Sequence, residues 1–245
     1  MQRRTLVSAL PALALGAGAR ALAASDTDTA HRYVALSLVS DQLVWVGAPG
    51  GETGSHIVRG QVKPVPMPSA PFDRTVLEVL AGEVPQLDAQ ARLTFLASTA
   101  PEAYAEQDDW FSGGHVALPA VLKSAVAAEG ASRLLLVTKA RGDAHISDGY
   151  NSKGIGKLSG LGFYSNSSQP MVDKQTGDLS KGYVAPYVYL TMSLVDTGTF
   201  TVIRQSGAQA AKPYVPMDRQ ALYDTLQRML VDNIRRTTRE VLQSA

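Results

Sequence analysis

The segment Arg133-Leu-Leu-Leu-Val-Thr138 decides the fold, because it is the strongest strand-forming stretch of the chain. Its side chains are apolar on both faces, which is typical of a strand that other elements cover on both sides. The sequence therefore predicts a sheet with this segment near its centre and helices packed against it.

Two strands and two helices precede this segment in alternation, at residues 33–39, 72–81, 93–97 and 118–129. In the first helix, Phe72, Val76 and Leu80 recur at helical spacing and predict one buried stripe. Gly130 ends the second helix, since glycine is favoured just past a helix C-terminus. Connections of this length favour parallel strands, so the first half is predicted to be a βαβαβ unit.

A further strand at 43–46 follows the first one after the polar residues Ser40-Asp41-Gln42. The two strands are predicted to form either a β-hairpin or one bent strand. Residues 63–71 are predicted to be extended surface chain, because their prolines exclude a central strand or a helix there.

The second half changes its pattern. Residues 142–182 are rich in glycine and polar side chains; within them, 157–164 is predicted to be a strand and 165–181 to be mobile. A half-buried strand at 187–194 then turns at Asp196-Thr-Gly-Thr199 and returns, which predicts an antiparallel hairpin.

The last element is an amphipathic helix of roughly six or seven turns that begins after Asp218, a side chain suited to a helix N-cap. The predicted fold class is therefore α/β: a mixed sheet with a βαβαβ first half, an antiparallel hairpin and a C-terminal amphipathic helix. A single domain is predicted for 24–245, with 142–182 as a glycine-rich insertion.

The first 23 residues have the layout of a secretory signal peptide. A basic head at Met1-Gln-Arg-Arg4 precedes an apolar stretch, and Ala21-Leu22-Ala23 predicts cleavage after Ala23. Arg3-Arg4 also resembles a twin-arginine export signal, and the ordinary Sec route stays open beside it. No cysteine follows, so we expect a mature chain without a lipid or transmembrane anchor, periplasmic or secreted from a bacterium.

Composition narrows the function. Without the three arginines of the predicted signal, the chain keeps 20 basic residues against 22 acidic ones, a formal net charge of −2. That balance excludes a strongly basic nucleic-acid-binding protein, which needs clustered lysine and arginine. A hydrophobic content of 45% supports a buried core, and the absence of cysteine excludes disulfides and thiolate metal sites. We expect no cofactor.

The order of elements over 33–243, together with the hairpin stretch Leu194-Val195-Asp196-Thr197-Gly198, resembles the α/β domains of bacterial envelope assembly proteins. These are the curli-secretion lipoprotein, the penicillin-binding-protein activator lipoproteins and the amino-terminal domain of TolB. The resemblance implies a non-enzymatic assembly role. The chain departs from these families by lacking the lipid-bearing cysteine and by carrying the glycine-rich stretch.

One glycine- and lysine-rich segment is a candidate loop for a ligand or a partner: Lys153, Gly154, Gly156, Lys157, Gly160 and Gly162. Glycines beside lysines can present backbone N–H groups and ammonium charges to an anion. The spacing fits neither the P-loop nor the dinucleotide-binding pattern. The favoured interpretation is a β-hairpin or loop in which Ile155, Leu158, Leu161 and Phe163 pack inward.

The remaining polar motifs give weak signals. The four histidines, His31, His56, His115 and His145, have no metal-ligand spacing. Asp143, His145 and Ser147 alternate on one predicted strand face, where a solvated surface is favoured over a catalytic triad. Asp108-Asp109-Trp110 lacks the other ligands of a calcium loop.

Several tyrosines either form an exposed patch for a glycan or protein, or lie buried under the terminal helix; burial is favoured. They are Tyr164, Tyr183, Tyr187 and Tyr189, with Phe163 beside them.

The leading hypothesis is an exported, non-enzymatic binding or assembly protein that contacts an envelope protein or glycan and no nucleic acid. The alternative is a periplasmic hydrolase or carbohydrate-active enzyme that uses carboxylates such as Asp143 and Asp148.

Overall fold

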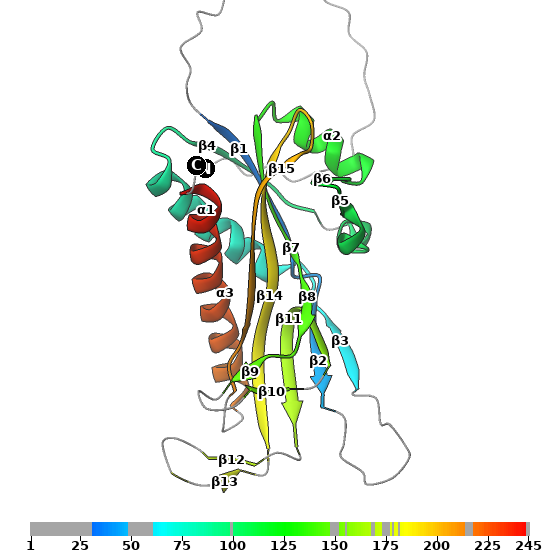
Figure 1. The fold of residues 1–245 in the computed structure, drawn as a ribbon, viewed down its shortest axis with the longest axis vertical. Coiled ribbons are helices and arrows are strands. Elements are labelled where there is room, and N and C mark those ends of the chain that lie inside the picture. Colours follow the sequence, from blue (N-terminus) through cyan, green and yellow to red (C-terminus); the bar gives the residue numbers. More distant parts are fainter. Residues whose placement is uncertain are drawn as a thin grey trace, which may run out of the picture.

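The computed structural model describes residues 31–48, 61–98, 100–147, 152–154, 156–167, 170–172, 177, 179–180, 182–213 and 218–243. The predicted signal with Ala23, His56, Asp148 and Ile155 lie outside the described residues. The described chain forms a mixed nine-stranded sheet with helices on both faces (Figure 1), which confirms the predicted α/β class.

The main sheet has the strand order β3-β2-β11-β14-β7-β1-β4, with β15 paired to β14 and β8 paired to β11. Its strands are β1 Arg32–Leu38, β2 Gln42–Gly47, β3 Val62–Pro66, β4 Arg92–Leu96, β7 Arg133–Lys139, β8 Arg141–Asp143, β11 Lys157–Asn166, β14 Tyr183–Asp196 and β15 Val202–Ala211. Small two-stranded pairs complete the structure: β5 Phe111–Ser112 with β6 His115–Val116, β9 Ile146–Ser147 with β10 Ser152–Lys153, and β12 Met171–Val172 with β13 Leu179–Ser180.

The long strand β14 joins two halves of the sheet. Its residues 190–196 pair with β7, which continues into β1 and β4; we call these three strands the upper half. Residues 183–189 of β14 pair with β11, which continues into β2 and β3, the lower half. β15 runs antiparallel along the other side of β14 and bridges both halves (Figure 1).

The upper half confirms the predicted βαβαβ unit, because β1 is parallel to both β4 and β7. β7 lies between β14 and β1, and its residues Leu134 to Val137 are fully buried, as its apolar sequence predicts. The hairpin alternative for the first two strands is wrong. β1 and β2 do not pair; the chain passes in the same direction from the upper half into the lower half, as one bent strand would.

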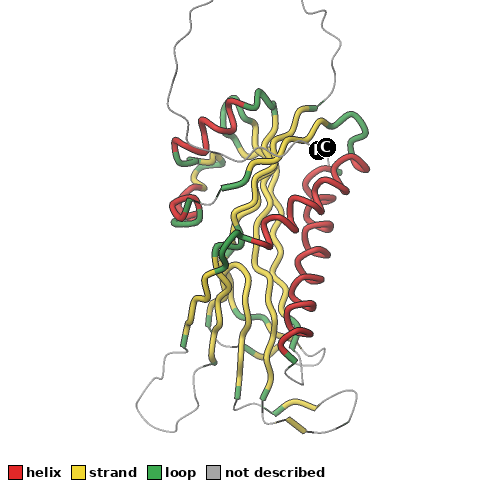
Figure 2. The backbone as a smooth tube through the Cα atoms, turned by 180° about the vertical axis from the view of Figure 1, so that it is seen from behind, coloured by secondary structure: helices red, strands yellow, loops and turns green. Residues whose placement is uncertain are grey.

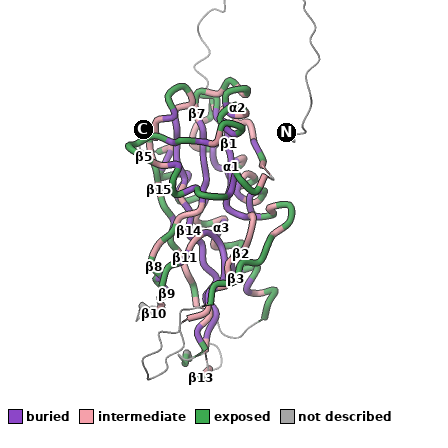
Figure 3. The backbone as a smooth tube through the Cα atoms, turned by 90° about the vertical axis from the view of Figure 1, so that its right-hand side faces the viewer, coloured by how far each residue is buried: buried purple, intermediate pink, exposed green. Residues whose placement is uncertain are grey.

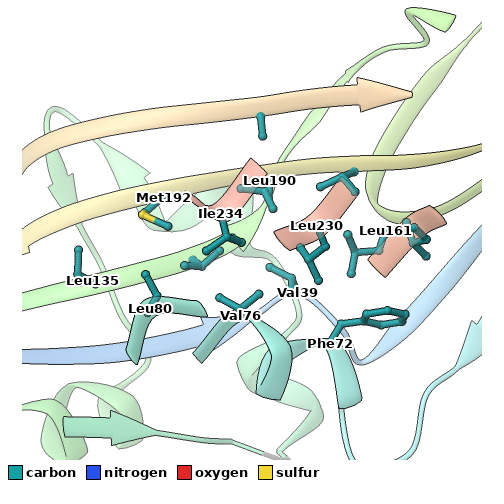
Figure 4. Packing of buried hydrophobic residues seen from close by; sticks show 14 of the residues in the cluster. Val39, Phe72, Val76, Leu80, Leu135, Leu161, Leu190, Met192, Leu230 and Ile234 are labelled. Atoms are coloured by element: carbon teal, nitrogen blue, oxygen red, sulfur yellow. The ribbon is translucent and has the colours of Figure 1, made fainter. Parts of the chain in front are cut away.

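Helices α1 Pro71–Leu87 and α3 Arg219–Leu242 pack on one face of the sheet, as Figure 2 shows. Their apolar stripes meet the sheet through Val76, Leu80, Leu230 and Ile234 (Figure 4). The Asp218 carboxylate accepts a hydrogen bond from the backbone N–H of Gln220, which confirms the predicted N-cap. α1 runs beyond the predicted 72–81, because Val84 in its last turns is also buried in this core.

The opposite face has two covers. Helix α2 Ala120–Ala128 and the 3-10 turns η1 Pro101–Ala103 and η2 Gln107–Trp110 pack on the upper half. On the lower half, Ala144, Ile146 and Leu158 cover four buried tyrosines: Tyr164, Tyr183, Tyr187 and Tyr189. The predicted burial of the tyrosines is confirmed, but their cover is the segment around β8 and β9 rather than the terminal helix.

One prediction for the second half needs correction, and another is confirmed. β14 was predicted as a half-buried strand, yet it is buried on both faces along most of its length (Figure 3), because both layers of cover reach it. The glycine-rich stretch 142–182 contributes β11, which lies inside the main sheet between β14 and β2. The strand predicted at 157–164 is confirmed and extends to Asn166.

Candidate functional site

Polar side chains gather where the parallel strands β1 and β7 end, the position at which open α/β sheets bind ligands. We call them the strand-end cluster: Ser37, Ser40, Asp41, Asp73, Tyr104, Gln107 and Lys139. They come from the ends of β1 and β7, the first turn of α1, and η1 with the turn after it. The cluster is the first place to look for chemistry.

Asp73 is the centre of this cluster. Its carboxylate accepts hydrogen bonds from the Ser37 hydroxyl at 2.6 Å, the Val39 backbone N–H at 2.7 Å and the Tyr104 hydroxyl at 2.9 Å. The Ser40 hydroxyl donates to the carboxylate at 3.1 Å and accepts from the Asp73 backbone N–H at 3.0 Å. Ser40 therefore serves the start of α1 in the way an N-cap side chain does.

Burial governs the protonation of this centre. Desolvation raises the pKa of Asp73 above its ordinary range, and the hydrogen bonds from Ser37, Val39 and Tyr104 act in the opposite direction. Burial, followed by the nearby Asp73 charge, also raises the pKa of Tyr104. Both groups are therefore held in one hydrogen-bonded arrangement and not exposed to solvent.

Lys139 and Gln107 tie the strand ends together. The Lys139 ammonium pairs with the Asp41 carboxylate at 2.5 Å and lies 5.6 Å from the centre of the Tyr104 ring. The Gln107 amide donates to the Leu38 carbonyl at 2.9 Å, and its oxygen accepts from the Lys139 backbone N–H at 2.9 Å. One side chain thus joins the ends of β1 and β7.

The polar groups of the strand-end cluster are therefore used in contacts within the protein. The Asp73 carboxylate is bonded to hydroxyl groups and a backbone N–H, the Gln107 amide is bonded to the backbone, and the Lys139 ammonium pairs with a carboxylate. In addition, β2 begins only a few residues after β1 ends. A crevice at the carboxyl ends of the strands is the usual ligand site of this fold class. Here the sheet continues into its lower half at that position.

The candidate loop of glycines and lysines is spread over several elements. Lys153 belongs to β10, Gly154 and Gly156 lie between β10 and β11, and the other three are in β11 itself: Lys157, Gly160 and Gly162. The Lys157 ammonium pairs with the Asp143 carboxylate of β8 at 2.6 Å, on the surface. Among the described side chains, that of Lys157 is engaged with a carboxylate, and Gly160 and Gly162 lie within the sheet.

Two of these glycines have contacts that explain them without a ligand. A Cβ on Gly162 would stand 1.9 Å from the Val44 carbonyl oxygen and 2.7 Å from the Tyr187 hydroxyl. The Tyr187 hydroxyl donates to that same carbonyl at 3.1 Å and so passes directly over the glycine. Gly154 has a φ of +144°, and a Cβ there would stand 2.4 Å from the Ala144 carbonyl oxygen. Both positions need glycine for internal packing.

The carboxylate alternative receives little support. The hydrogen bond and charge of Lys157 lower the pKa of Asp143, whereas a general acid needs a raised pKa. The contact that His145 makes with Asp143 is a main-chain hydrogen bond, from the His145 N–H to the Asp143 carbonyl at 2.9 Å. His31 pairs with Asp88 at 2.8 Å, far from this segment in the fold. Within the described ranges, no group of three His, Cys, Asp or Glu residues is placed to hold a metal ion.

An aromatic row on the lower half was missed by sequence reasoning. It consists of Trp45 on β2, Phe163 on β11 and Tyr223 on α3, with ring centres 5.6 Å and 5.7 Å apart in that order. Trp45 is half-buried and donates from Nε1 to the Ser165 hydroxyl at 2.9 Å, and Tyr223 is 39% exposed. The three residues are distant in sequence, so only the pairing of β2 with β11 and the docking of α3 reveal the row.

Known proteins give distant structural likenesses. No protein-family model and no curated protein matches the sequence. A DUF330-family protein of Xanthomonas campestris aligns at a TM-score of 0.39 and 10% identity, covering 86% of this chain and 83% of its own. A putative neuraminyllactose-binding hemagglutinin homolog of Helicobacter pylori aligns at 0.37 and 7%, covering 91% and 89%. PelC of Paraburkholderia phytofirmans, solved as a dodecamer, aligns at 0.29 and 8%, covering 84% and 88%.

These three proteins come from bacteria, and none belongs by its description to the curli-secretion, penicillin-binding-protein activator or TolB families. At these TM-scores the likenesses assign neither a family nor a function. Among the helices of the described chain, none has the length and apolar character required to cross a bilayer.

Proposed function

We propose that this chain is an exported protein of the bacterial envelope that acts as a binding or assembly module and not as an enzyme. The observation that carries the proposal is the strand-end cluster. The groups of this cluster that could serve catalysis are engaged in contacts within the protein. The Tyr104 hydroxyl donates to the Asp73 carboxylate, and the Lys139 ammonium pairs with Asp41. Export rests on the signal-like sequence of residues 1–23.

The aromatic row is the surface that we assign to partner contact. Tryptophan and tyrosine are enriched at the centres of protein interfaces, since they bury much area with few rotatable bonds. Tyr223 is exposed and Trp45 half-exposed at the edge of the helix layer, next to the exposed strand β3. As the sequence analysis suggests, we propose an envelope protein or a glycan as the partner of this surface.

Binding is tested by isolating the tagged protein with its cross-linked partners from native envelopes. We expect the wild-type protein to enrich a partner that the double variant Trp45→Ala, Tyr223→Ala loses. Val121→Ala is the matched control, because Val121 is 64% exposed on α2, at the other end of the molecule. Equal enrichment by the double variant would contradict the assignment of the surface.

The enzyme alternative is tested on the same preparation. We expect no hydrolysis of envelope glycans or peptides above that of a denatured control. Turnover by the wild-type protein that Asp143→Asn abolishes would overturn the proposed function, whether or not a partner is captured.

A further inference from the structure

Three of the edge strands of the sheet, β3, β4 and β15, differ in how they expose their backbone. β3 is the last strand of the lower half, and β4 is the last strand of the upper half. β15 is the last strand on the other side of β14. An exposed edge offers unpaired N–H and C=O groups to another strand, and proteins usually protect such edges. Which groups face outward follows from the hydrogen bonds at the ends of each ladder.

The β3 edge is closed by proline. Gly47 donates from its N–H to the Gln61 carbonyl, and Met67 donates to the Asp41 carbonyl, so odd-numbered residues of this segment face β2. Pro64 and Pro66 therefore occupy outward positions, where they remove the N–H groups that a further strand would need. The β4 edge has only five residues, which limits its pairing in another way.

The start of β15 is covered, because the Val202 N–H donates to the Gly114 carbonyl at 2.8 Å. Beyond it, from Ile203 to Gln209, the described residues leave the β15 edge open. The Lys212 N–H donates to the Pro186 carbonyl at 3.1 Å, so the even-numbered residues of β15 face β14 and the odd-numbered ones face outward. The outward residues Ile203, Gln205, Gly207 and Gln209 are all exposed, and none is proline. Arg236 donates to the Gly207 carbonyl at 3.1 Å. A carbonyl oxygen has a second lone pair, so this contact leaves room for a hydrogen bond from a further strand.

We infer that β15 pairs antiparallel with β15 of a second copy of this chain, about a two-fold axis at Gly207. In this register Gln205 lies opposite the partner's Gln209, on the face that both side chains already share. Arg204, the one charged residue of the strand, lies opposite the partner's Ala210. Arg236 of each copy reaches the axis at Gly207, where its charge is balanced by its own ion pair with Glu240 at 2.8 Å. The small side chains of Ser206, Gly207 and Ala208 leave the backbones free to approach.

A second copy is favoured as the occupant because β15 is the one long edge without an outward proline in the described part of the chain, and the same edge of a second copy offers matching groups. Head-to-tail pairing through two different edges would build an open fibre, and the prolines of β3 block that route. Pairing of β15 with itself closes after two copies. This inference does not depend on the proposed envelope function.

The register is tested by the mass of the purified protein in solution, measured by light scattering over a concentration series. We expect a dimer for the wild-type chain. Gln205→Lys with Gln209→Lys places lysine opposite lysine twice and should shift the dissociation constant upward at least tenfold. Gln205→Lys with Gln209→Glu places opposite charges there and should restore the dimer.

Gly207→Pro is the second variant. It removes an outward N–H group from β15, as Pro64 and Pro66 do on β3. It should yield a folded monomer, with circular dichroism like that of the wild-type chain. A monomeric wild-type protein would overturn the inference, and so would a dimer that both the double-lysine variant and Gly207→Pro leave intact. The inference would also be overturned if the β15 edge were found to bind a strand of a different protein and not a second copy of this chain.

Discussion

Two edges of this sheet, the five-residue β3 and the ten-residue β15, differ in which backbone groups they leave available to a further strand. β3 is exposed along its whole length and carries proline at two outward positions. β15 exposes its outward residues without any proline and receives one guanidinium, that of Arg236. Since exposure alone does not distinguish these edges, the donors that remain on each one decide what it can bind.

The largest effect is expected from opening the closed edge. Pro64→Thr with Pro66→Thr restores two outward N–H groups on a strand that already exposes Val62 and Val65. With two usable edges, copies can add without closing, so we expect concentration-dependent assemblies larger than a dimer. Sedimentation velocity measures this, and a size distribution identical to that of the wild type would show that the prolines do not close the edge.

The next largest effect is the difference in stability between two proline substitutions at neighbouring positions of β15. Ser206→Pro removes an N–H that faces β14 and should lower the free energy of unfolding by about 2–3 kcal/mol. Gly207→Pro removes an outward N–H and should cost less than about 1 kcal/mol in the monomer. Urea unfolding measures both variants. Equal losses would mean that the assignment of inward and outward positions is wrong.

A smaller effect is expected from Arg236→Ala. Arg236 pairs with Glu240 at 2.8 Å and donates to the Gly207 carbonyl, and the pair is partly exposed, so the loss should be about 0.5–1 kcal/mol. The hydrogen bond from Ser206, followed by Arg236, lowers the pKa of Glu240.

The pH dependence of this loss has a definite sign. A lowered carboxyl pKa contributes stability that is fully present above the unfolded-state value, 4.5, and that disappears as the pH falls through the folded-state value. The difference between the wild type and Arg236→Ala should therefore shrink below pH 4.5. A difference that grows on acidification would contradict the assigned pair.

The smallest effect is expected at Pro186, a proline within the central strand β14. Its carbonyl accepts from Lys212, just past the end of β15, so its missing N–H falls at the last rung of that ladder. Pro186→Val should change the free energy of unfolding by no more than about 0.5 kcal/mol. A loss of several kcal/mol in thermal unfolding would show that the proline is needed for the course of β14.

The sequence predicts where helices and strands lie along the chain better than it predicts which strands pair with one another. The periodicity of the terminal helix, its Asp218 cap and the buried β7 are local patterns, and all are confirmed. The strand at 157–164 is predicted and confirmed, but its place between β14 and β2 is not predicted. The reason for Gly162, the Tyr187 hydroxyl reaching Val44, joins residues 143 positions apart.

The candidate site shows the same limit. Asp73, Ser37 and Ser40 carry no recognisable motif, and they meet only because α1 begins beside the end of β1. The aromatic row likewise depends on α3 reaching β11. Local spacing contains no information on either convergence, and no alignment of motifs would have placed these side chains together.

The late position of β14 in the chain also governs the order of folding. Until residues 183–196 have been made, neither β7 nor β11 can pair with β14, and one backbone edge of β7 stays unpaired. The three strands of the upper half are complete in sequence by Lys139, but the two halves share no strand until β14 has been made. Closure of the sheet must therefore wait for the last quarter of translation, so a chain interrupted before Tyr183 would leave its most apolar strand open to other unfinished chains.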